Sequence, residues 1–387
     1  MPGDPTTNLC HSLQDGTEAT YVPYGDHHVV ETFGAYEAEY AVIRKGVGIM
    51  DMPPRGLIEM RGADRTAFLQ AMVTNDVASL DSRLARRALY LDKAGRIQAD
   101  LVICQCDEQV THVIVDAHDA QRLVEGFNQY IFTEDVELEN QSNRYRQISL
   151  HGPAAHELLG TVCTEPLVNL DPWCCTSILI EGYRCRVFRR DETGSPGLHI
   201  ICPLAHVAAI YKNLSGAVGG LVPDVETSAK RTIVGRGIGW LAYNTARIEA
   251  GASIYHIDYG PDTLPHEAAL IEQTVSFTKG CYPGQEIVAR MENLGHPKRL
   301  LVGLHLDDAR LPIAGAQVFD SSYDDAHVVG AVTSSSVSPM RGGKAIGLAM
   351  VKWGLCQIGT ELSVFADGKR MLAVVANPYP DEITKCN

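Results

Sequence analysis

Residues 278–286 carry the densest set of chemically active groups in the chain. They read TKGCYPGQE and place one thiol among a lysine, an amide and a carboxylate. Gly280 and Gly284 permit backbone angles that other residues resist, and the proline between them restricts one torsion. Such a loop can hold Cys281 beside Lys279, and a nearby ammonium favours the thiolate, a better nucleophile or metal ligand. The alternative is a tight turn around a small buried thiol.

Asp100 is the strongest carboxylate candidate. It follows a glycine-containing turn and stands on a segment that continues as Leu-Val-Ile, which has strand character. A charge in that position is costly unless another group pairs with it. The sequence therefore predicts a functional acid at Asp100, with an aspartate bonded to backbone amides at a strand end as the alternative.

Arg247 and Glu249 are a second pair of charged candidates. They stand two residues apart and precede Gly251 and the polar-aromatic run YHIDY at 255–259. The alternative to a functional role is a surface ion pair, which contributes little to stability.

Composition excludes several classes of protein. The 387 residues have a net charge of −14, which disfavours an extended nucleic-acid surface because such a surface needs a basic face. No run of 18 apolar residues predicts a membrane span, and the start shows no signal-peptide pattern. Eleven cysteines without a Cys-x-x-Cys pair indicate reduced thiols in a cytoplasmic protein and predict no metal site.

The elements that must position these residues are of mixed type. The first three quarters of the chain alternate strands and helices, which predicts an α+β fold with mostly antiparallel sheets. Asp64 is expected to cap a helix that carries an apolar face. A hairpin with its turn at 92–96 leads into the strand of Asp100. The predicted helices are 36–44 and 119–131, a further helix starts at 150–153, and the predicted strands include 56–61, 87–91, 99–104, 110–115 and 184–189.

The composition changes after residue 297. Short apolar segments follow, separated by glycine and proline, and they predict a small antiparallel β-barrel. The expected domains are a flexible N-terminal arm at 1–20, an α+β region at 21–297 and a C-terminal β-barrel at 298–387. The predicted barrel strands are 300–306, 317–320, 328–334, 344–351, 361–365 and 370–375.

Three runs resemble one known family. RIEAG at 247–251, TLPHE at 263–267 and VSFTKGCYPGQE at 275–286 resemble the glycine-cleavage T-protein superfamily. Within it, the KGCYxGQE pattern is similar to that of YgfZ-type folate-binding proteins, since aminomethyltransferases have no cysteine at this point. The resemblance implies a cloverleaf of two α+β lobes with a C-terminal β-barrel.

The resemblance also implies a tetrahydrofolate site. Asp100 matches the essential acid that lies beside the folate, where it orients the cofactor or assists proton transfer. Two positions depart from the aminomethyltransferase pattern, because Ser195 stands in place of a glutamate and Tyr243 in place of an arginine. The implied catalytic residues are Asp100 and Cys281. The implied folate contacts are Asn75, Tyr90, Ser195, Tyr243, Arg247 and Glu249, and the motif residues are Lys279, Gly280, Gly284, Gln285 and Glu286.

Three functions follow from the resemblance. The first is a folate-binding protein that assists the maturation of iron–sulfur client proteins through its tetrahydrofolate site and Cys281. The second is a tetrahydrofolate-dependent aminomethyltransferase, or a related one-carbon transferase, that uses Asp100 and a lipoyl carrier protein. The third is a binding protein whose folate site has decayed.

Overall fold

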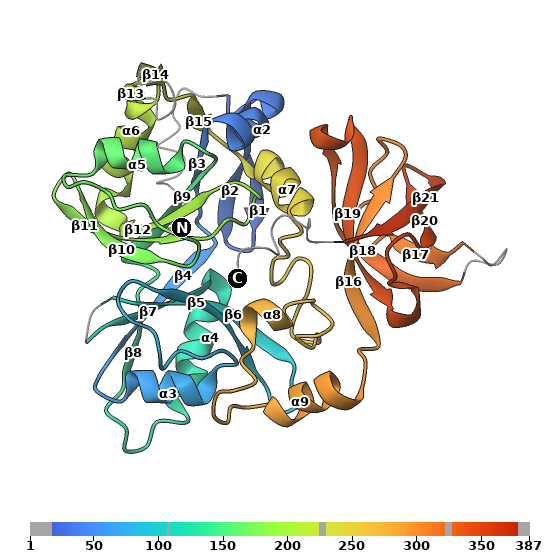
Figure 1. The fold of residues 1–387 in the computed structure, drawn as a ribbon, viewed down its shortest axis with the longest axis horizontal. Coiled ribbons are helices and arrows are strands. Elements are labelled where there is room, and N and C mark those ends of the chain that lie inside the picture. Colours follow the sequence, from blue (N-terminus) through green and yellow to red (C-terminus); the bar gives the residue numbers. More distant parts are fainter. Residues whose placement is uncertain (1–17, 107–108, 224–229, 322–326, 378–387) are drawn as a thin grey trace. The chain divides into compact units, whose positions relative to one another are not determined.

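The computed structural model describes residues 18–106, 109–223, 230–321 and 327–377. These residues form two compact units, coloured by sequence in Figure 1. The expected N-terminal arm, residues 1–20, lies outside the described residues except for its last three positions. The described residues of the first unit are those up to Leu69, together with Val77–Arg87 and Leu101–Tyr243. The described residues of the second unit are Gln70–Asp76, Ala88–Asp100 and those from Asn244 onward.

A six-stranded sheet organises the first unit, in the order β10-β11-β12-β9-β3-β15. Its neighbours pair in antiparallel fashion except β15, which runs parallel to β3. Helices α5 (Ala155–Val162) and α6 (Val207–Ala217) bury their leucines and isoleucines in the same core as the sheet. The strands are β10 (Cys175–Ile180), β11 (Tyr183–Arg189), β12 (Gly197–Pro203), β9 (Tyr145–His151), β3 (Val47–Asp51) and β15 (Gly235–Gly237).

A five-stranded sheet follows the order β5-β6-β7-β4-β8, and its strands β5 and β6 contribute residues to both units. Helix α4 (Ala117–Asn128) begins after Asp116, whose side chain accepts the backbone N–H of His118 at 3.0 Å and so caps the helix. Helix α3 (Arg65–Met72) contacts α4 through an edge-to-face pair of Phe68 and Phe127. The strands are β5 (Ala85–Leu91), β6 (Ile97–Gln105), β7 (Thr111–Asp116), β4 (Arg55–Arg61) and β8 (Glu137–Asn140).

Two local predictions for this half of the chain are wrong. Asp64 precedes α3, but its Oδ2 accepts the backbone N–H of Asp135 at 2.9 Å, so the carboxylate fastens a loop instead of capping the helix. Residues 150–153 do not start a helix either. His151 still belongs to β9, and α5 begins at Ala155. The hairpin of β5 and β6 and the helix α2 (Tyr36–Lys45) agree with the sequence.

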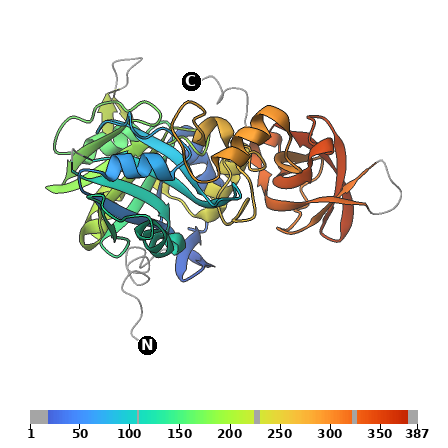
Figure 2. The ribbon, with the colours of Figure 1, turned by 90° about the horizontal axis from the view of Figure 1, so that it is seen from below.

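A closed six-stranded antiparallel barrel forms the C-terminal part of the second unit. Its strands are orange to red in Figure 1 and are seen from below in Figure 2. Alternating valines, leucines and alanines from all six strands fill its core. The order is β16-β19-β18-β17-β20-β21, with β16 (Arg299–Leu306), β19 (Lys344–Lys352), β18 (Val328–Ser338), β17 (Gln317–Asp320), β20 (Glu361–Ala366) and β21 (Lys369–Ala376).

The predicted fold class, α+β with a C-terminal antiparallel β-barrel, is confirmed. All six predicted barrel strands are present, and β18 runs four residues beyond its predicted end, to Ser338. The second unit also contains the C-terminal part of α7 (Trp240–Glu249), the short α8 (Ile271–Thr274) and α9 (Gln285–Leu294). Among the described residues, no helix combines the length and apolar character that a membrane crossing needs.

Candidate active site

Asp100 and Tyr259 form the centre of the candidate site in the second unit. Asp100 lies half-buried on β6, and its Oδ2 accepts a 2.5 Å hydrogen bond from the Tyr259 hydroxyl. Hydrogen bonds to an ionised carboxylate are short and strong, so this contact fixes the orientation of the acid. The strand therefore presents an oriented, partly accessible carboxylate, which is the kind of group that general acid–base chemistry requires.

The loop 254–260 presents Tyr259 in a tightly bonded turn. The carboxylate of Asp258 accepts the N–H of Ile254 at 2.8 Å, and the N–H of Asp258 returns to the carbonyl of Ile254 at 2.8 Å. The N–H of His256 donates to the carbonyl of Tyr259 at 2.8 Å. His256 has φ of 69°, a left-handed angle that costs energy for a residue with a side chain. The surrounding hydrogen bonds hold the loop in this conformation.

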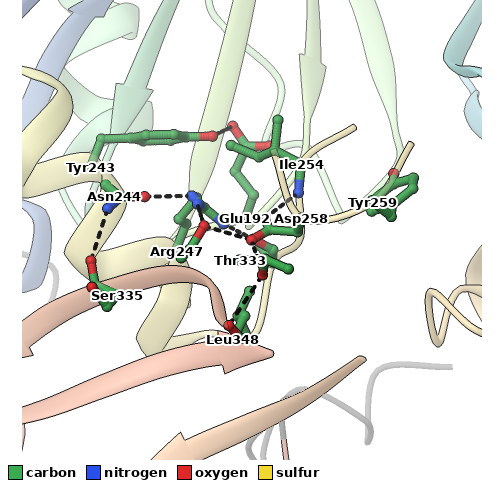
Figure 3. Close-up of polar contacts among 12 residues, drawn as sticks. Glu192, Tyr243, Asn244, Arg247, Ile254, Asp258, Tyr259, Thr333, Ser335 and Leu348 are labelled. Carbon is green, nitrogen blue, oxygen red and sulfur yellow. Dashed lines mark hydrogen bonds and ion pairs between the residues drawn. The ribbon is translucent and has the colours of Figure 1, made fainter. Parts of the chain in front are cut away.

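A buried ion pair anchors that loop. Arg247 of α7 donates to Oδ2 of Asp258 at 2.7 Å, and both side chains are 0% exposed. The guanidinium also donates to Asn244 Oδ1 at 2.9 Å and to Ser334 Oγ at 2.7 Å. Figure 3 shows the Arg247 guanidinium between helix α7 and the barrel strand. Arg247, expected from the sequence to contact folate, is completely buried in this structure and holds the loop through Asp258.

Glu249 is also bound by the barrel. The Ser338 hydroxyl donates to Glu249 Oε1, and Ser338 ends β18. Arg247 and Glu249 therefore do not form a surface ion pair with each other. Each side chain projects from α7 to a different barrel serine.

A pocket of about 370 Å³ lies next to Tyr259. Its walls are the loop 256–263 together with Arg299, Ala331, Thr333 and Met350. Arg299 is held at one edge by Asp262, 2.9 Å away, and by Glu267, 3.4 Å away. The pocket combines aromatic and apolar walls with a few polar groups at its edge, which is the composition of small-molecule sites.

The motif at 278–286 packs against the turn that precedes the strand of Asp100. Gly284 has φ of 79° and is the N-cap of α9. A side-chain carbon at this position would lie 2.6 Å from the carbonyl oxygen of Asp92 and 2.8 Å from the Cα of Gly95. Only glycine fits such an angle and such a close approach. Gly280 shows neither constraint, because a side-chain carbon there would have no heavy atom within 4 Å.

The Lys279 ammonium binds backbone carbonyls and not the Cys281 thiol. It donates to the backbone carbonyls of Gln70, Val73 and Asn75, and it lies 5.2 Å from the centre of the Tyr282 ring. Burial lowers the pKa of Lys279 to about 8. The lysine therefore fastens the segment 70–75 to the motif. Activation of the thiol by this ammonium, as expected from sequence, is not supported by these contacts.

The remaining motif residues differ in exposure. Cys281 is exposed, so its sulfur is reachable, and Glu286 is exposed in the first turn of α9. Gln285 is half-buried in that turn, and its N–H donates to the carbonyl of Tyr282. Burial raises the pKa of Tyr282 to about 12. The tyrosine packs in one hydrophobic cluster with Tyr259.

The other expected folate contacts of the second unit are Asn75 and Tyr90. Asn75 is 9% exposed; its amide donates to the carbonyl of Gln273 at 3.3 Å, and its side-chain oxygen accepts the N–H of Asp76 at 2.9 Å. These contacts brace the segment that Lys279 holds. Tyr90 is half-buried on β5, and its backbone forms an isolated antiparallel β-bridge with Val73.

Ser195 and Tyr243 belong to the first unit. Tyr243 is 1% exposed, and its hydroxyl donates to Glu192 Oε1 at 2.7 Å, as Figure 3 shows. Glu192 is also paired with Arg190 at 3.2 Å. Ser195 is half-buried and accepts a 3.4 Å hydrogen bond from Arg44. Tyr243, expected from the sequence to contact folate, is enclosed in this structure and bonded to Glu192.

The acid that binds Tyr243 belongs to a buried charged cluster. Burial disfavours ionisation of Glu192, but the charges of Arg190 and Arg55 outweigh it and hold the pKa of the carboxyl well below its ordinary value. Burial lowers the pKa of His151 to about 4 and that of His199 to about 3. Both imidazoles are therefore neutral at pH 7, and the arginines supply the positive charge that balances Glu192.

The sequence does not single out Tyr259, Asp258 or the two hydroxyls that bind Asp258. Thr333 and Ser334 donate to Asp258 Oδ1 at 2.9 and 2.6 Å from a barrel strand more than seventy positions away. The only signal was the polar-aromatic character of 255–259, which marked the run without showing which residue reaches Asp100.

Comparisons with known proteins agree with this architecture. The profile of the GCVT N-terminal domain matches residues 10–279, and that of the glycine cleavage T-protein C-terminal barrel domain matches residues 299–380. An aminomethyltransferase of Geobacillus kaustophilus (strain HTA426) is 30% identical over 363 residues, 94% of this chain and 94% of the relative. One from Halalkalibacterium halodurans is 27% identical over 361 residues, 92% and 93% of the two chains.

A solved structure shares the fold. Aminomethyltransferase T of the glycine cleavage system from Bartonella henselae has a TM-score of 0.83 at 23% identity and covers 96% of this chain and 97% of its own. At that identity the likeness establishes the fold alone. Together with the two profile matches and the relative that is 30% identical, it leads to one assignment. This chain belongs to the glycine cleavage T-protein family.

Proposed function

We propose that this protein is a tetrahydrofolate-dependent one-carbon transferase of the aminomethyltransferase type, with Asp100 as its acid–base residue. The observation that carries the proposal is the half-buried Asp100 carboxylate, oriented by Tyr259 at 2.5 Å on the strand that follows the β5–β6 turn. The relatives named aminomethyltransferase, matched over more than nine tenths of both chains, support the reaction class.

The pocket beside Tyr259, the residue whose hydroxyl binds Asp100, has a lining that suits a flat heterocycle. A pteridine needs aromatic and apolar contacts on its faces and a few hydrogen-bonding groups at its edge. Tyr259, His256 and Met350 supply the first, and Arg299 supplies a polar group at the edge. The volume of about 370 Å³ is within the roughly 300–1,000 Å³ of small-molecule sites. These features support tetrahydrofolate, or a one-carbon derivative, as the ligand.

Asp100 would act by holding negative charge beside the transferred group. Tetrahydrofolate, when bound, would supply the amine nitrogens that accept the one-carbon unit. An ionised carboxylate next to an attacking amine can orient its N–H and take the proton as a bond to carbon forms. It can also stabilise a positively charged iminium-like group electrostatically. Both actions require the fixed orientation that the Tyr259 hydroxyl gives to Asp100.

The test is transfer from an aminomethylated lipoyl carrier protein to tetrahydrofolate. Wild-type protein should form methylenetetrahydrofolate and release ammonia and the reduced lipoyl carrier. Asp100→Asn, which keeps the shape but removes the charge, should lower kcat by about 10²–10⁴-fold. Asp307→Asn is a matched control, because Asp307 is an exposed carboxylate that pairs with Lys344 at 3.0 Å and does not line the pocket. Full activity of Asp100→Asn, or no product from the wild type, would reject the proposal.

Exposure of Cys281 supports a second function, assistance in the maturation of iron–sulfur client proteins. A reachable sulfur in a glycine-bounded loop can act as a transient thiolate ligand or nucleophile. Cys281→Ser should then reduce the activity of iron–sulfur enzymes in cells while leaving methylenetetrahydrofolate formation unchanged. Normal client activity in this variant excludes the maturation role.

Partners and compartment follow from the same proposal. A transferase of this type needs a lipoyl carrier protein as its donor, and the maturation role needs iron–sulfur clients. The nine cysteines among the described residues are free thiols, which supports a reducing compartment such as the cytoplasm.

A further inference from the structure

Two consecutive barrel hydroxyls reach one carboxylate oxygen. Thr333 and Ser334 are neighbours on β18, yet both donate to Oδ1 of Asp258, at 2.9 and 2.6 Å. Consecutive residues of a regular strand point to opposite faces of the sheet, so this geometry needs an interruption of the strand. The interruption is a β-bulge, because the pairing of β18 with β19 shifts register between Val332 and Ser334. Bulges re-aim side chains and often lie next to functional sites.

Asp258 connects the barrel hydroxyls to the loop 254–260 through its two carboxylate oxygens. Its Oδ1 receives the barrel hydroxyls, and its Oδ2 receives the N–H of Ile254 at 2.8 Å and the Arg247 guanidinium at 2.7 Å. One fully buried carboxylate therefore bonds the barrel, helix α7 and the loop 254–260 (Figure 3). A shift of the barrel strand would move the loop with it.

The loop ends at the residue that binds Asp100. The Tyr259 hydroxyl donates to Asp100, and the Tyr259 ring packs in a cluster with Tyr282 of the cysteine motif and Ile97 of β6. Ile97 stands on the strand of Asp100, three positions earlier. The ring is thus held by the core, and its hydroxyl by the carboxylate that it orients.

We propose that the β-barrel sets the geometry of Asp100 in this protein: the bulge hydroxyls hold Asp258, Asp258 holds the loop, and the loop places Tyr259 as a positioning residue for the acid. The inference rests on the transferase function proposed above. It gives the C-terminal barrel a part in positioning the acid, through one chain of side-chain contacts.

Energetics favour a positioning role for the ion pair within this chain. A buried ion pair contributes little net stability compared with packed apolar residues, because both charges lose their hydration. Positioning, in contrast, has a large effect on rate, since a displacement of about 1 Å at a reacting group can cost about 100-fold. The number of hydrogen bonds gathered on Asp258 is explained by the precision that Tyr259 needs.

The first test uses the ligand-free full-length protein. Thr333→Val combined with Ser334→Ala removes both bulge hydroxyls and should increase amide deuterium exchange in residues 254–260 by about tenfold or more. Thr333→Ser combined with Ser334→Ala keeps one of the two hydroxyls. Its residues 254–260 should therefore be better protected from exchange than in the first double variant. Ser335→Ala is the matched control on the same strand, because the Ser335 hydroxyl donates to Pro312 O at 2.6 Å and not to Asp258. Unchanged exchange in the first double variant overturns the anchor.

A double-mutant cycle tests the last contact. Tyr259→Phe and Asp100→Asn should be coupled by about fivefold or more in the unfolding equilibrium constant, because the first removes the donor and the second removes the acceptor's charge from the same hydrogen bond. Tyr255→Phe is the control partner: its hydroxyl lies in the same loop but donates to Ile97 O at 3.3 Å, so its effect should add independently to that of Asp100→Asn. Additive effects for Tyr259→Phe and Asp100→Asn contradict the proposal.

Activity separates positioning from simple stability. Tyr259→Phe should lower kcat by about 10- to 100-fold while the KM for tetrahydrofolate stays within about threefold. Wild-type kcat in this variant overturns the inference. If wild-type protein itself transfers no one-carbon unit, the proposed function fails instead, and the exchange and coupling measurements still decide whether the barrel positions Tyr259 and Asp100.

Discussion

Gly284 stands so close to Asp92 that a side-chain carbon at position 284 would lie 2.6 Å from the Asp92 carbonyl oxygen. This contact joins the cysteine motif to the turn between β5 and β6, the hairpin that carries Asp100. The motif therefore supports the candidate acid through backbone packing as well as offering an exposed thiol.

Gly284→Ala is expected to destabilise the protein by about 2–4 kcal/mol, because the new methyl group meets backbone atoms and φ of 79° is strained for alanine. Chemical denaturation measures the loss. Gly280→Ala is the matched control in the same loop, since a side-chain carbon there meets no heavy atom within 4 Å. Equal losses in the two variants would contradict the assignment of the close contact.

Asp258→Asn should cost about 3–5 kcal/mol of unfolding free energy, because it leaves the Arg247 guanidinium buried without a counter-charge. Urea unfolding curves give the value. Arg83→Ala provides the contrast: Arg83 and Asp81 form an ion pair with side chains 84% and 46% exposed, so its loss should change stability by less than about 1 kcal/mol. A small effect at Asp258 would argue that the loop is not anchored there.

Acid should destabilise the first unit through its buried histidines. The pKa of His151 is lowered to about 4 in the folded protein, so between pH 6.5 and 4 the unfolded chain binds more protons than the folded one. The contribution of His151 to the unfolding free energy is fully present above pH 6.5. It is lost as the pH falls toward 4, and the loss is about 3 kcal/mol. His199, with its pKa lowered to about 3, acts in the same direction.

Thermal unfolding between pH 4 and 8 measures this dependence. His151→Gln should flatten the slope of the melting temperature against pH. His28→Gln is the control at an exposed histidine of the same unit and should leave the slope unchanged. A wild-type melting temperature that does not fall below pH 6.5 would rule out the buried neutral histidines.

Lys279→Met should destabilise the protein by about 1–3 kcal/mol, because the backbone carbonyls of the segment 70–75 lose a shared donor. The same variant should change the rate of Cys281 alkylation by less than about twofold, since the ammonium is directed to those carbonyls. Mass spectrometry of the alkylated peptide follows the reaction. A large drop in the rate would restore the view that Lys279 activates the thiol.

Lys279 also predicts a pH effect at the alkaline end. Its pKa is lowered to about 8 by burial, so the folded protein releases this proton before the unfolded chain does. Between pH 8 and 10.5 the stability contributed by this group should therefore rise with pH. The difference in melting temperature between wild type and Lys279→Met, measured across that range, tests the direction.

The chain's local patterns determined most of the fold. Alternating apolar residues and their glycine and proline boundaries predicted all six barrel strands, because a strand that buries one face must alternate. The turn at 92–96 predicted the hairpin, and the charge on β6 marked Asp100. The cysteine motif and the neighbouring runs indicated the family, which the profile matches confirm.

Only the tertiary structure decided what the candidate side chains contact. Arg247 and Lys279 carry charges that suggest ligand binding or thiol activation, yet one is buried on Asp258 and the other binds backbone carbonyls. The partner of Asp100 is Tyr259, which is 159 positions away. Its placement depends on a bulge in a barrel strand, where one extra residue turns two hydroxyls to the same side. Local periodicity specifies which face of an element is buried, but a long-range partner is chosen by packing, which no short segment encodes alone.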